Sequence, residues 1–258
     1  MISRFLITLF FIFGAVEAVD IHAFLVIDFE AIGIEDSMRY NYARWERELK
    51  KIERYTDIVV KWHVHHDMKF LEDLKNLEPD PDDVILFYWS GHGFRSSQKD
   101  VQKNPWPSFL FENIPDAAID FDELTKLMEA KGARLLIAIA ETCNQQIPFF
   151  FSPPHLNLNI KGEKTTTLLE RVQRNMHELY VRPSGVVKLA SSQPGQMSYV
   201  NTESMSFFTC AFLEVYKNEV YLSDSISWEE ILTKATNFLI ELNHHDEQVP
   251  LIDIALQN

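Results

Sequence analysis

The sequence predicts an α/β protein with a mostly parallel sheet that is covered by helices on both faces. Two observations support this fold class. Several short runs are apolar at nearly every position, as expected of strands buried on both sides. The stretches between them repeat apolar residues every three or four positions, which is the spacing of amphipathic helices. Strands therefore alternate with helices along the chain, and this alternation favours parallel pairing.

Five runs have the strand pattern. The third run, VILFYW, is apolar at every residue, so it fits the centre of a sheet better than an edge. The predicted strands are His22–Phe29, Asp57–Val64, Val84–Trp89, Arg134–Ala140 and Gly185–Ala190.

Five stretches have the helix pattern. In the first, apolar residues recur at helical spacing from Tyr42 to Ile52, and either Asp36 or Ser37 is suited to cap its start. Proline or glycine follows the second and third stretches and is expected to end them. The predicted helices are Met38–Ile52, Asp67–Leu77, Phe121–Lys131, Met205–Tyr216 and Trp228–Leu242.

The chain has 258 residues, enough for one large domain or two small ones. No period of 20–50 residues repeats, which excludes a solenoid. We expect one domain over residues 19–258. Residues 149–183 contain Pro153, Pro154 and several basic residues, and we expect them to form an exposed connection between a first part, 19–148, and a second part, 184–258.

The charge and the cysteine content exclude several classes of function. With 24 Lys and Arg against 38 Asp and Glu, the net charge is −14, which argues against binding to nucleic acid and suits a basic peptide or protein partner. Only Cys143 and Cys210 are present, so neither a disulfide scaffold nor a zinc site of four cysteines is possible.

Residues 1–18 have the pattern of a secretory signal peptide. Arg4 precedes the apolar run Phe5–Phe13, and Val16 and Ala18 place small residues at a cleavage site. The run is about half of the ~20 residues that a membrane-spanning helix needs. We therefore expect an exported protein, secreted or periplasmic, that has no membrane partner once the signal is removed.

Two of the predicted strands lead into residues that carry chemistry. His92 follows the third strand, within SGHG, and Cys143 follows the fourth, within ETCN. Ligands of open parallel sheets bind beyond the carboxyl ends of the strands, so the two side chains share one rim if these strands are neighbours. An imidazole can then take the thiol proton, and the thiolate can attack a carbonyl carbon. The alternatives are an inert thiol at the end of a core strand and a turn histidine.

These motifs resemble those of caspase-like cysteine peptidases, of the bacterial branch similar to metacaspases and paracaspases. Caspases carry a histidine about 50 residues before their cysteine, and here Cys143 follows His92 by 51 residues. The resemblance extends from His22 to Pro250. Its segments are DDVILFYWSGHG, LLIAIAETCN, GVVKLASSQPGQMSYV and MSFFTCAFLEVY.

The resemblance implies a three-layer sandwich with a six-stranded, mostly parallel sheet between helices. It also implies a cysteine endopeptidase that forms an acyl-thioester at Cys143, with His92 as its partner. The amides of Gly93 and Cys143 are the expected donors to the oxyanion.

Metacaspase-like members carry an acidic residue two positions before the cysteine, in the S1 pocket that receives the substrate's P1 side chain. Glu141 occupies this position, so the resemblance implies cleavage after Arg or Lys. Alternatively, Glu141 caps a loop or pairs with a basic residue. Asp36 either adds a second carboxylate to this pocket or caps the first helix. Ser191, with Ser192, either pairs with the substrate backbone or is an ordinary strand-end serine.

Two departures from the family pattern keep other functions open. Residues 144–146 read Asn-Gln-Gln where His-Ser-Gly or Asn-Ser-Gly is commoner, and a second acidic residue after the fifth strand is missing. A pseudo-peptidase that binds peptides without cutting them is one alternative, and a legumain-like or gingipain-like specificity is another.

We expect no cofactor. His63 and His65 share a strand face but lack a familiar metal spacing, so we also expect no metal. The calcium requirement and the oligomeric state stay open.

Overall fold

The protein's structure, a computed structural model, describes residues 19–111, 118–146, 168–200, 205–243 and 248–257. Strands and helices alternate through most of the chain, as the apolar periodicity predicts. In chain order the elements are β1 (Asp20–Ile27), α1 (Glu35–Tyr55), β2 (Val59–His65), α2 (Phe70–Asn76), β3 (Val84–Ser90), β4 (Gly93–Phe94), β5 (Ser108–Leu110), β6 (Ala118–Asp120), α3 (Phe121–Glu129), β7 (Leu135–Glu141), α4 (Leu168–Tyr180), β8 (Ser184–Ala190), α5 (Phe207–Leu222), α6 (Trp228–Asn243) and β9 (Leu251–Gln257).

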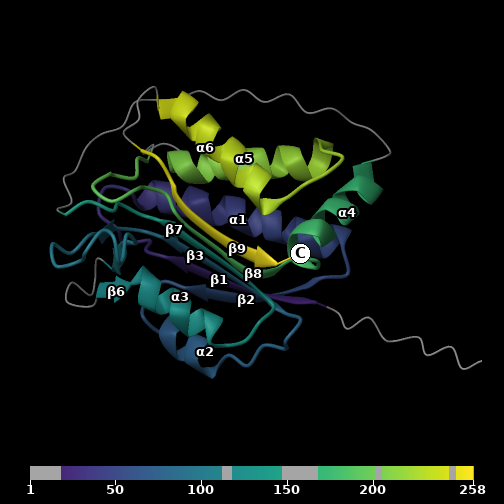
Figure 1. The fold of residues 1–258 in the computed structure, drawn as a ribbon, viewed down its shortest axis with the longest axis horizontal. Coiled ribbons are helices and arrows are strands. Elements are labelled where there is room, and N and C mark those ends of the chain that lie inside the picture. The colour runs from purple at the N-terminus through teal and green to yellow at the C-terminus, as the bar shows by residue number, and fades with distance from the viewer. Residues whose placement is uncertain (1–18, 112–117, 147–167, 201–204, 244–247, 258) are drawn as a thin grey trace, which may run out of the picture.

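The centre of the molecule is a six-stranded sheet in the order β2-β1-β3-β7-β8-β9. The first five strands are parallel, and β9 is antiparallel to β8. Helices lie on both sides of the sheet (Figure 1). This arrangement confirms the predicted fold class and the six-stranded, mostly parallel sheet that the resemblance implies.

Four helices, α1, α4, α5 and α6, cover one face of the sheet (Figure 1). Alternate residues of each strand point to this face, which is why Tyr88 of β3 lies in its core. The ring of Trp45 lies 5.0 Å from that of Tyr88 and 5.7 Å from that of Phe212, so α1 and α5 meet over β3. Aromatic pairs at such separations add to the energy of burial.

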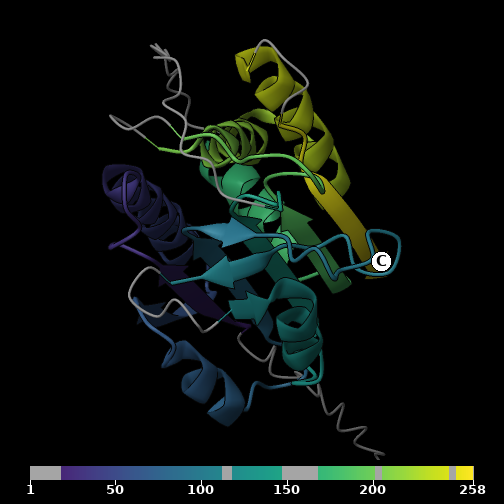
Figure 2. The same ribbon diagram turned by 90° about the vertical axis from the view of Figure 1, so that its left-hand side faces the viewer.

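The other face is covered by α2, α3 and a small antiparallel sheet in the order β4-β5-β6 (Figure 2). Phe87 and Trp89 of β3 point to this face. The ring of Trp89 stacks on that of Phe109 at 4.6 Å and meets that of Phe111 edge-on at 4.8 Å. The small sheet therefore continues directly from the carboxyl end of β3 and packs back onto it.

The start of α1 differs from the prediction. The helix begins at Glu35, and the residue before it, Ile34, makes no side-chain cap. Asp36 and Ser37 lie inside the first turn, so the expectation that one of them caps the helix is wrong. Ser37 is buried and faces the core, whereas the exposed carboxylate of Asp36 lies where the helix dipole favours negative charge.

The expectation of an exposed connection over residues 149–183 is wrong for its second half. Residues 168–180 form α4, whose buried residues Val172, Met176, Leu179 and Tyr180 pack against the sheet. They recur at helical spacing, but the charged residues between them hide the pattern. The part of this stretch before residue 168 lies outside the described residues, as does the expected signal peptide. Among the described helices, none combines the length and the apolar character required to cross a membrane.

Two glycines with positive φ allow a test of how closely β8 and β9 approach. Gly185 of β8 has φ +115°, and a Cβ atom added there would lie 2.1 Å from the carbonyl oxygen of Ala255. Gly132 has φ +79°, but nothing lies within 4 Å of an added Cβ. Gly132→Ala should lower the free energy of unfolding by about 1–2 kcal/mol through backbone strain alone.

Gly185→Ala should lower the free energy of unfolding by about 1–3 kcal/mol more than Gly132→Ala does, because its methyl group also collides with the backbone of β9. Urea unfolding of both variants measures the difference. Equal losses would contradict the close approach of the two strands.

Candidate active site

The two motifs that carry chemistry meet at one edge of the main sheet. β3 and β7 are neighbours in parallel register, with Ser90 directly beside Glu141. His92 and Cys143 each follow two residues after this matched pair. The expectation that the histidine strand and the cysteine strand lie side by side is therefore confirmed, and both loops leave the sheet at its carboxyl edge.

Thr142 brings the backbones of the two loops into contact. Its hydroxyl donates a hydrogen bond of 3.0 Å to the carbonyl oxygen of Gly91, the residue before His92. A Cβ atom at Gly93, the residue after His92, would lie 2.1 Å from the same hydroxyl oxygen. No larger residue fits at position 93 unless the loops move apart.

The His92 side chain is partly exposed, and its Nε2 lies 3.2 Å from the carbonyl oxygen of Ile32, in the loop between β1 and α1. A ring nitrogen that faces a carbonyl oxygen must donate its hydrogen. In the neutral ring, Nδ1 then carries no hydrogen and is the nitrogen that can accept a proton.

The Cys143 side chain is partly exposed and contacts the backbone of Ser198. Its Sγ accepts a hydrogen bond of 3.4 Å from the amide of Ser198 and lies 3.8 Å from the carbonyl oxygen of that residue. Burial raises the pKa of Cys143, the Ser198 amide opposes this rise, and the charge of Glu141 adds to it. At neutral pH the resting side chain is therefore a thiol rather than a thiolate.

Glu141 is 2% exposed, and protein donors occupy both oxygens of its carboxylate. Oε1 accepts a hydrogen bond from the hydroxyl of Ser198. Oε2 accepts from the amide of Thr209 at 3.0 Å and from its hydroxyl at 2.8 Å. Thr209 lies in the first turn of α5, so Glu141 accepts from the free donors at the start of this helix. These contacts match the alternative that Glu141 is a capping residue, although it caps a helix and not a loop. Burial raises the pKa of Glu141, although these donors oppose the rise.

Ser191 is fully buried, and its backbone is already paired. Its amide donates to the carbonyl oxygen of Ala140 at 2.8 Å, and its own carbonyl oxygen accepts from Gln248 at 3.0 Å. This contradicts the expectation that Ser191 pairs with a substrate strand, because no backbone donor is left for that purpose.

Asp36 and Gly93 lie on the same rim of the sheet as the two loops. Asp36 is exposed in the first turn of α1, four residues after Ile32, whose carbonyl contacts His92. Gly93 belongs to β4 and pairs with Phe109. Their suggested roles, in the S1 pocket and in the oxyanion hole, stay predictions.

Sequence reasoning missed a group of hydrogen-bonded polar residues behind the site, most of them buried. The Ser198 hydroxyl, which donates to Glu141, lies 2.9 Å from that of Ser191 and accepts from Gln248 at 3.2 Å. Asn144 is fully buried, and its amide donates to the carbonyl oxygens of Pro105 and Ser192. Most of these partners are about 40–57 residues apart, so no local spacing could have revealed them.

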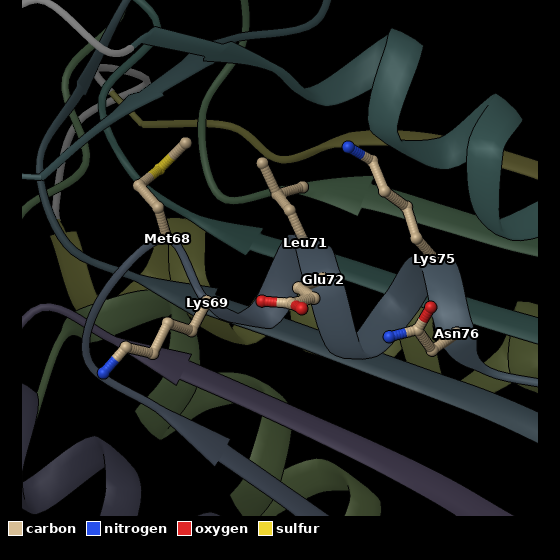
Figure 3. Close-up of a pocket in the computed structure, with 6 residues that line it drawn as sticks. All are labelled: Met68, Lys69, Leu71, Glu72, Lys75 and Asn76. Carbon is tan, nitrogen blue, oxygen red and sulfur yellow. The ribbon is translucent and has the colours of Figure 1, made fainter.

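The two surface hollows and the remaining histidine and cysteine side chains do not form a second candidate active site in the described part of the chain. A surface hollow at α2 contains neither a cysteine nor a histidine and is lined by Met68, Lys69, Leu71, Glu72, Lys75 and Asn76 (Figure 3). A second hollow, between α4, α6 and β9, also lies apart from His92 and Cys143. His63 stacks on Phe24 at 4.2 Å. Within the described residues, no three His, Cys, Asp or Glu side chains are placed to hold a metal ion. Cys143 and Cys210 are both free thiols.

Comparison with known proteins agrees with this architecture. Residues 51–257 match the caspase domain family. No curated protein matched the chain. Among solved structures, the crystal structure of caspase-1 from Spodoptera frugiperda superposes with a TM-score of 0.52. The superposition covers 92% of this chain and 87% of that chain at 15% identity, which is a likeness of fold. Since the family match spans most of the chain and the fold agrees with it, the protein belongs to the caspase domain family of cysteine peptidases.

Proposed function

We propose that the protein is a cysteine endopeptidase in which His92 and Cys143 act as a dyad. The observation that carries this proposal is the matched register of β3 and β7, together with the Thr142 hydrogen bond that joins the loops beyond them. Both side chains are partly exposed at the carboxyl edge of the sheet, where a substrate can reach them.

The proposed mechanism follows from the protonation of the Cys143 thiol and the His92 ring. Because the resting sulfur is protonated, its proton passes to Nδ1 of His92 as Sγ attacks the carbonyl carbon of the substrate. The new S–C bond leaves a negative oxygen, for which the amides of Gly93 and Cys143 are the proposed donors. The C–N bond then breaks, and the imidazolium gives its proton to the leaving amine. Water, deprotonated by His92, hydrolyses the acyl-thioester.

The substrates we propose are peptides or proteins that are cut after Arg or Lys. Burial and, to a smaller extent, the charge of Glu141 raise the pKa of Cys143. The negative charge of Glu141 therefore acts on the sulfur that would attack the substrate. The exposed carboxylate of Asp36 lies on the same rim. A negative field of this kind attracts a basic P1 side chain and repels an acidic one.

The proposed site of action is outside the cytoplasm. This rests on the pattern of residues 1–18, with Arg4 before a short apolar run and small residues at a cleavage position. The proposed partners are basic peptides or proteins, which the net charge of −14 suits.

Removal of either member of the dyad tests the proposal. With a fluorogenic peptide carrying Arg or Lys at P1, Cys143→Ala should abolish hydrolysis, because no nucleophile remains. His92→Ala should lower kcat by about 10²–10⁴-fold, the usual contribution of a general base. Cys210→Ala is the matched control, since it removes the chain's other thiol, and it should keep full activity. Activity that survives Cys143→Ala would refute the proposal.

A pseudo-peptidase that binds peptides without cutting them is the second candidate. The burial that raises the pKa of Cys143 favours it, because it lowers the fraction of the sulfur present as the reactive thiolate. Saturable binding of the same peptide, without turnover and unchanged in Cys143→Ala, would support this alternative.

The pH dependence of substrate choice tests the role of Glu141. Because burial raises its pKa above the ordinary value of 4.5, the carboxyl group stays neutral at pH values where an exposed glutamate is already ionised. A P1 lysine stays charged up to about pH 10. The ratio of kcat/KM for a P1 Lys peptide to that for a P1 norleucine peptide should therefore rise as pH rises through the raised pKa.

Taking the ratio cancels every ionisation that the cleavage of both peptides requires, so it isolates the effect on the P1 charge. In Glu141→Gln the ratio should be lower and independent of pH. In Asp36→Asn it should fall only slightly at every pH, because solvent screens an exposed charge. A flat ratio in the unmodified protein, or faster cleavage after Asn or Asp, would contradict the basic specificity and leave the dyad untouched.

A further inference from the structure

We propose that Thr142 is a positioning residue that sets the separation between His92 and Cys143. The inference rests on the proposed peptidase function and extends it to a side chain beside the dyad. Thr142 directly precedes Cys143, and it contacts the backbone on both sides of His92.

The first contact is the hydrogen bond from the Thr142 hydroxyl to the carbonyl oxygen of Gly91, at 3.0 Å. Thr142 is 1% exposed, so water cannot replace this bond. A buried carbonyl oxygen without a donor is unfavourable, so this hydrogen bond favours the observed arrangement of the loops.

The second contact is with Gly93. A Cβ atom there would lie 2.1 Å from the hydroxyl oxygen of Thr142 and 2.9 Å from its methyl carbon. The side chain of Thr142 therefore fills the space that a side chain at position 93 would need. Together, the two contacts fix the His92 loop at Gly91 and at Gly93.

Thr142 is itself held by the end of β8. Its amide donates to the Ser191 hydroxyl at 2.9 Å, and its carbonyl oxygen accepts from the Ser192 hydroxyl at 3.0 Å. Every polar group of Thr142 is thus bonded to a buried partner. Two backbone hydrogen bonds also join the loops, from the Gly91 amide to Glu141 at 3.4 Å and from the Arg95 amide to Gln145 at 2.8 Å. Thr142 adds a side chain that contacts the glycines on both sides of His92 and is itself anchored by the two serines after β8.

The rate of a reaction between two enzyme groups depends steeply on their separation, and a displacement of about 1 Å can cost 10²-fold. Valine has nearly the shape of threonine but donates no hydrogen bond. In Thr142→Val a methyl group faces the carbonyl oxygen of Gly91, which must move away from it. Serine keeps the donor and loses only the methyl group.

The test compares kcat and KM of Thr142→Val and Thr142→Ser with those of the unmodified protein, using the P1 Lys peptide. Thr142→Val should lower kcat by about 10²-fold, while KM changes little because the residue is buried away from the substrate. Thr142→Ser should recover most of kcat. Thr142→Ala serves as a second test of hydroxyl loss if the valine variant does not fold.

Thr125→Val is the matched control. The Thr125 hydroxyl is also buried and donates to a backbone carbonyl oxygen, that of Phe121, at 2.7 Å, but it lies in α3. This variant removes a buried threonine hydroxyl away from the dyad and should keep full kcat. A kcat of Thr142→Val equal to that of the unmodified protein, or an equal loss of kcat in Thr125→Val, would overturn the proposal.

A second readout separates this inference from the proposed function. Alkylation of Cys143 by iodoacetamide at neutral pH should slow down in His92→Ala, because the imidazole no longer accepts the thiol proton, and also in Thr142→Val. If His92→Ala slows alkylation and neither Thr142→Val nor Thr142→Ala does, only the role of Thr142 is refuted. If His92→Ala has no effect and no peptide is cut, the dyad fails, and the role of Thr142 fails with it.

Discussion

The site depends on one structural relation, the in-register parallel pairing of β3 with β7. This pairing places Ser90 beside Glu141, so the His92 and Cys143 loops leave the sheet at matched positions on its carboxyl edge. A shift of one residue would turn every side chain of one strand to the opposite face, and the buried aromatic residues on both sides of β3 forbid such a shift. The core packing of the sheet thus determines where His92 and Cys143 lie, and Thr142 transmits that placement to the two loops.

Behind the loops, polar side chains replace the usual apolar core. Asn41 of α1 donates to the hydroxyls of Ser90 and Ser206, and Glu141 accepts hydrogen bonds from the first turn of α5. An unsatisfied polar group here would be costly, and each of these bonds links a different element to the edge of the sheet. The bonds are directional, whereas apolar contacts tolerate sliding. We infer that the network stabilises one geometry of the loops, at the cost of burying the Glu141 carboxyl, whose pKa is raised by that burial.

Much of the fold, but less of the site, could be predicted from the sequence. The strand VILFYW is identifiable because burial on both faces removes every polar residue from it. The helix α4 was missed because its buried residues Val172, Met176 and Leu179 stand among charged residues that cover its exposed side. His92 and Cys143 could be selected because each follows an apolar strand. Ser198, Gln248 and Thr142 could not, since a hydroxyl or an amide gains its role only from partners that the topology brings close. The capping role of Glu141 depends likewise on α5, which begins 66 residues later.

The most direct test of the dyad is covalent labelling by a peptidyl acyloxymethyl ketone with Lys at P1, measured by intact-protein mass spectrometry and peptide mapping. A thiol that an imidazole activates displaces the carboxylate of this reagent and keeps the peptidyl group as a thioether. Our account predicts one label per chain, located on Cys143, with labelling greatly slowed in His92→Ala. Labelling of Cys210 instead, or an unchanged rate at Cys143 in His92→Ala, would contradict it.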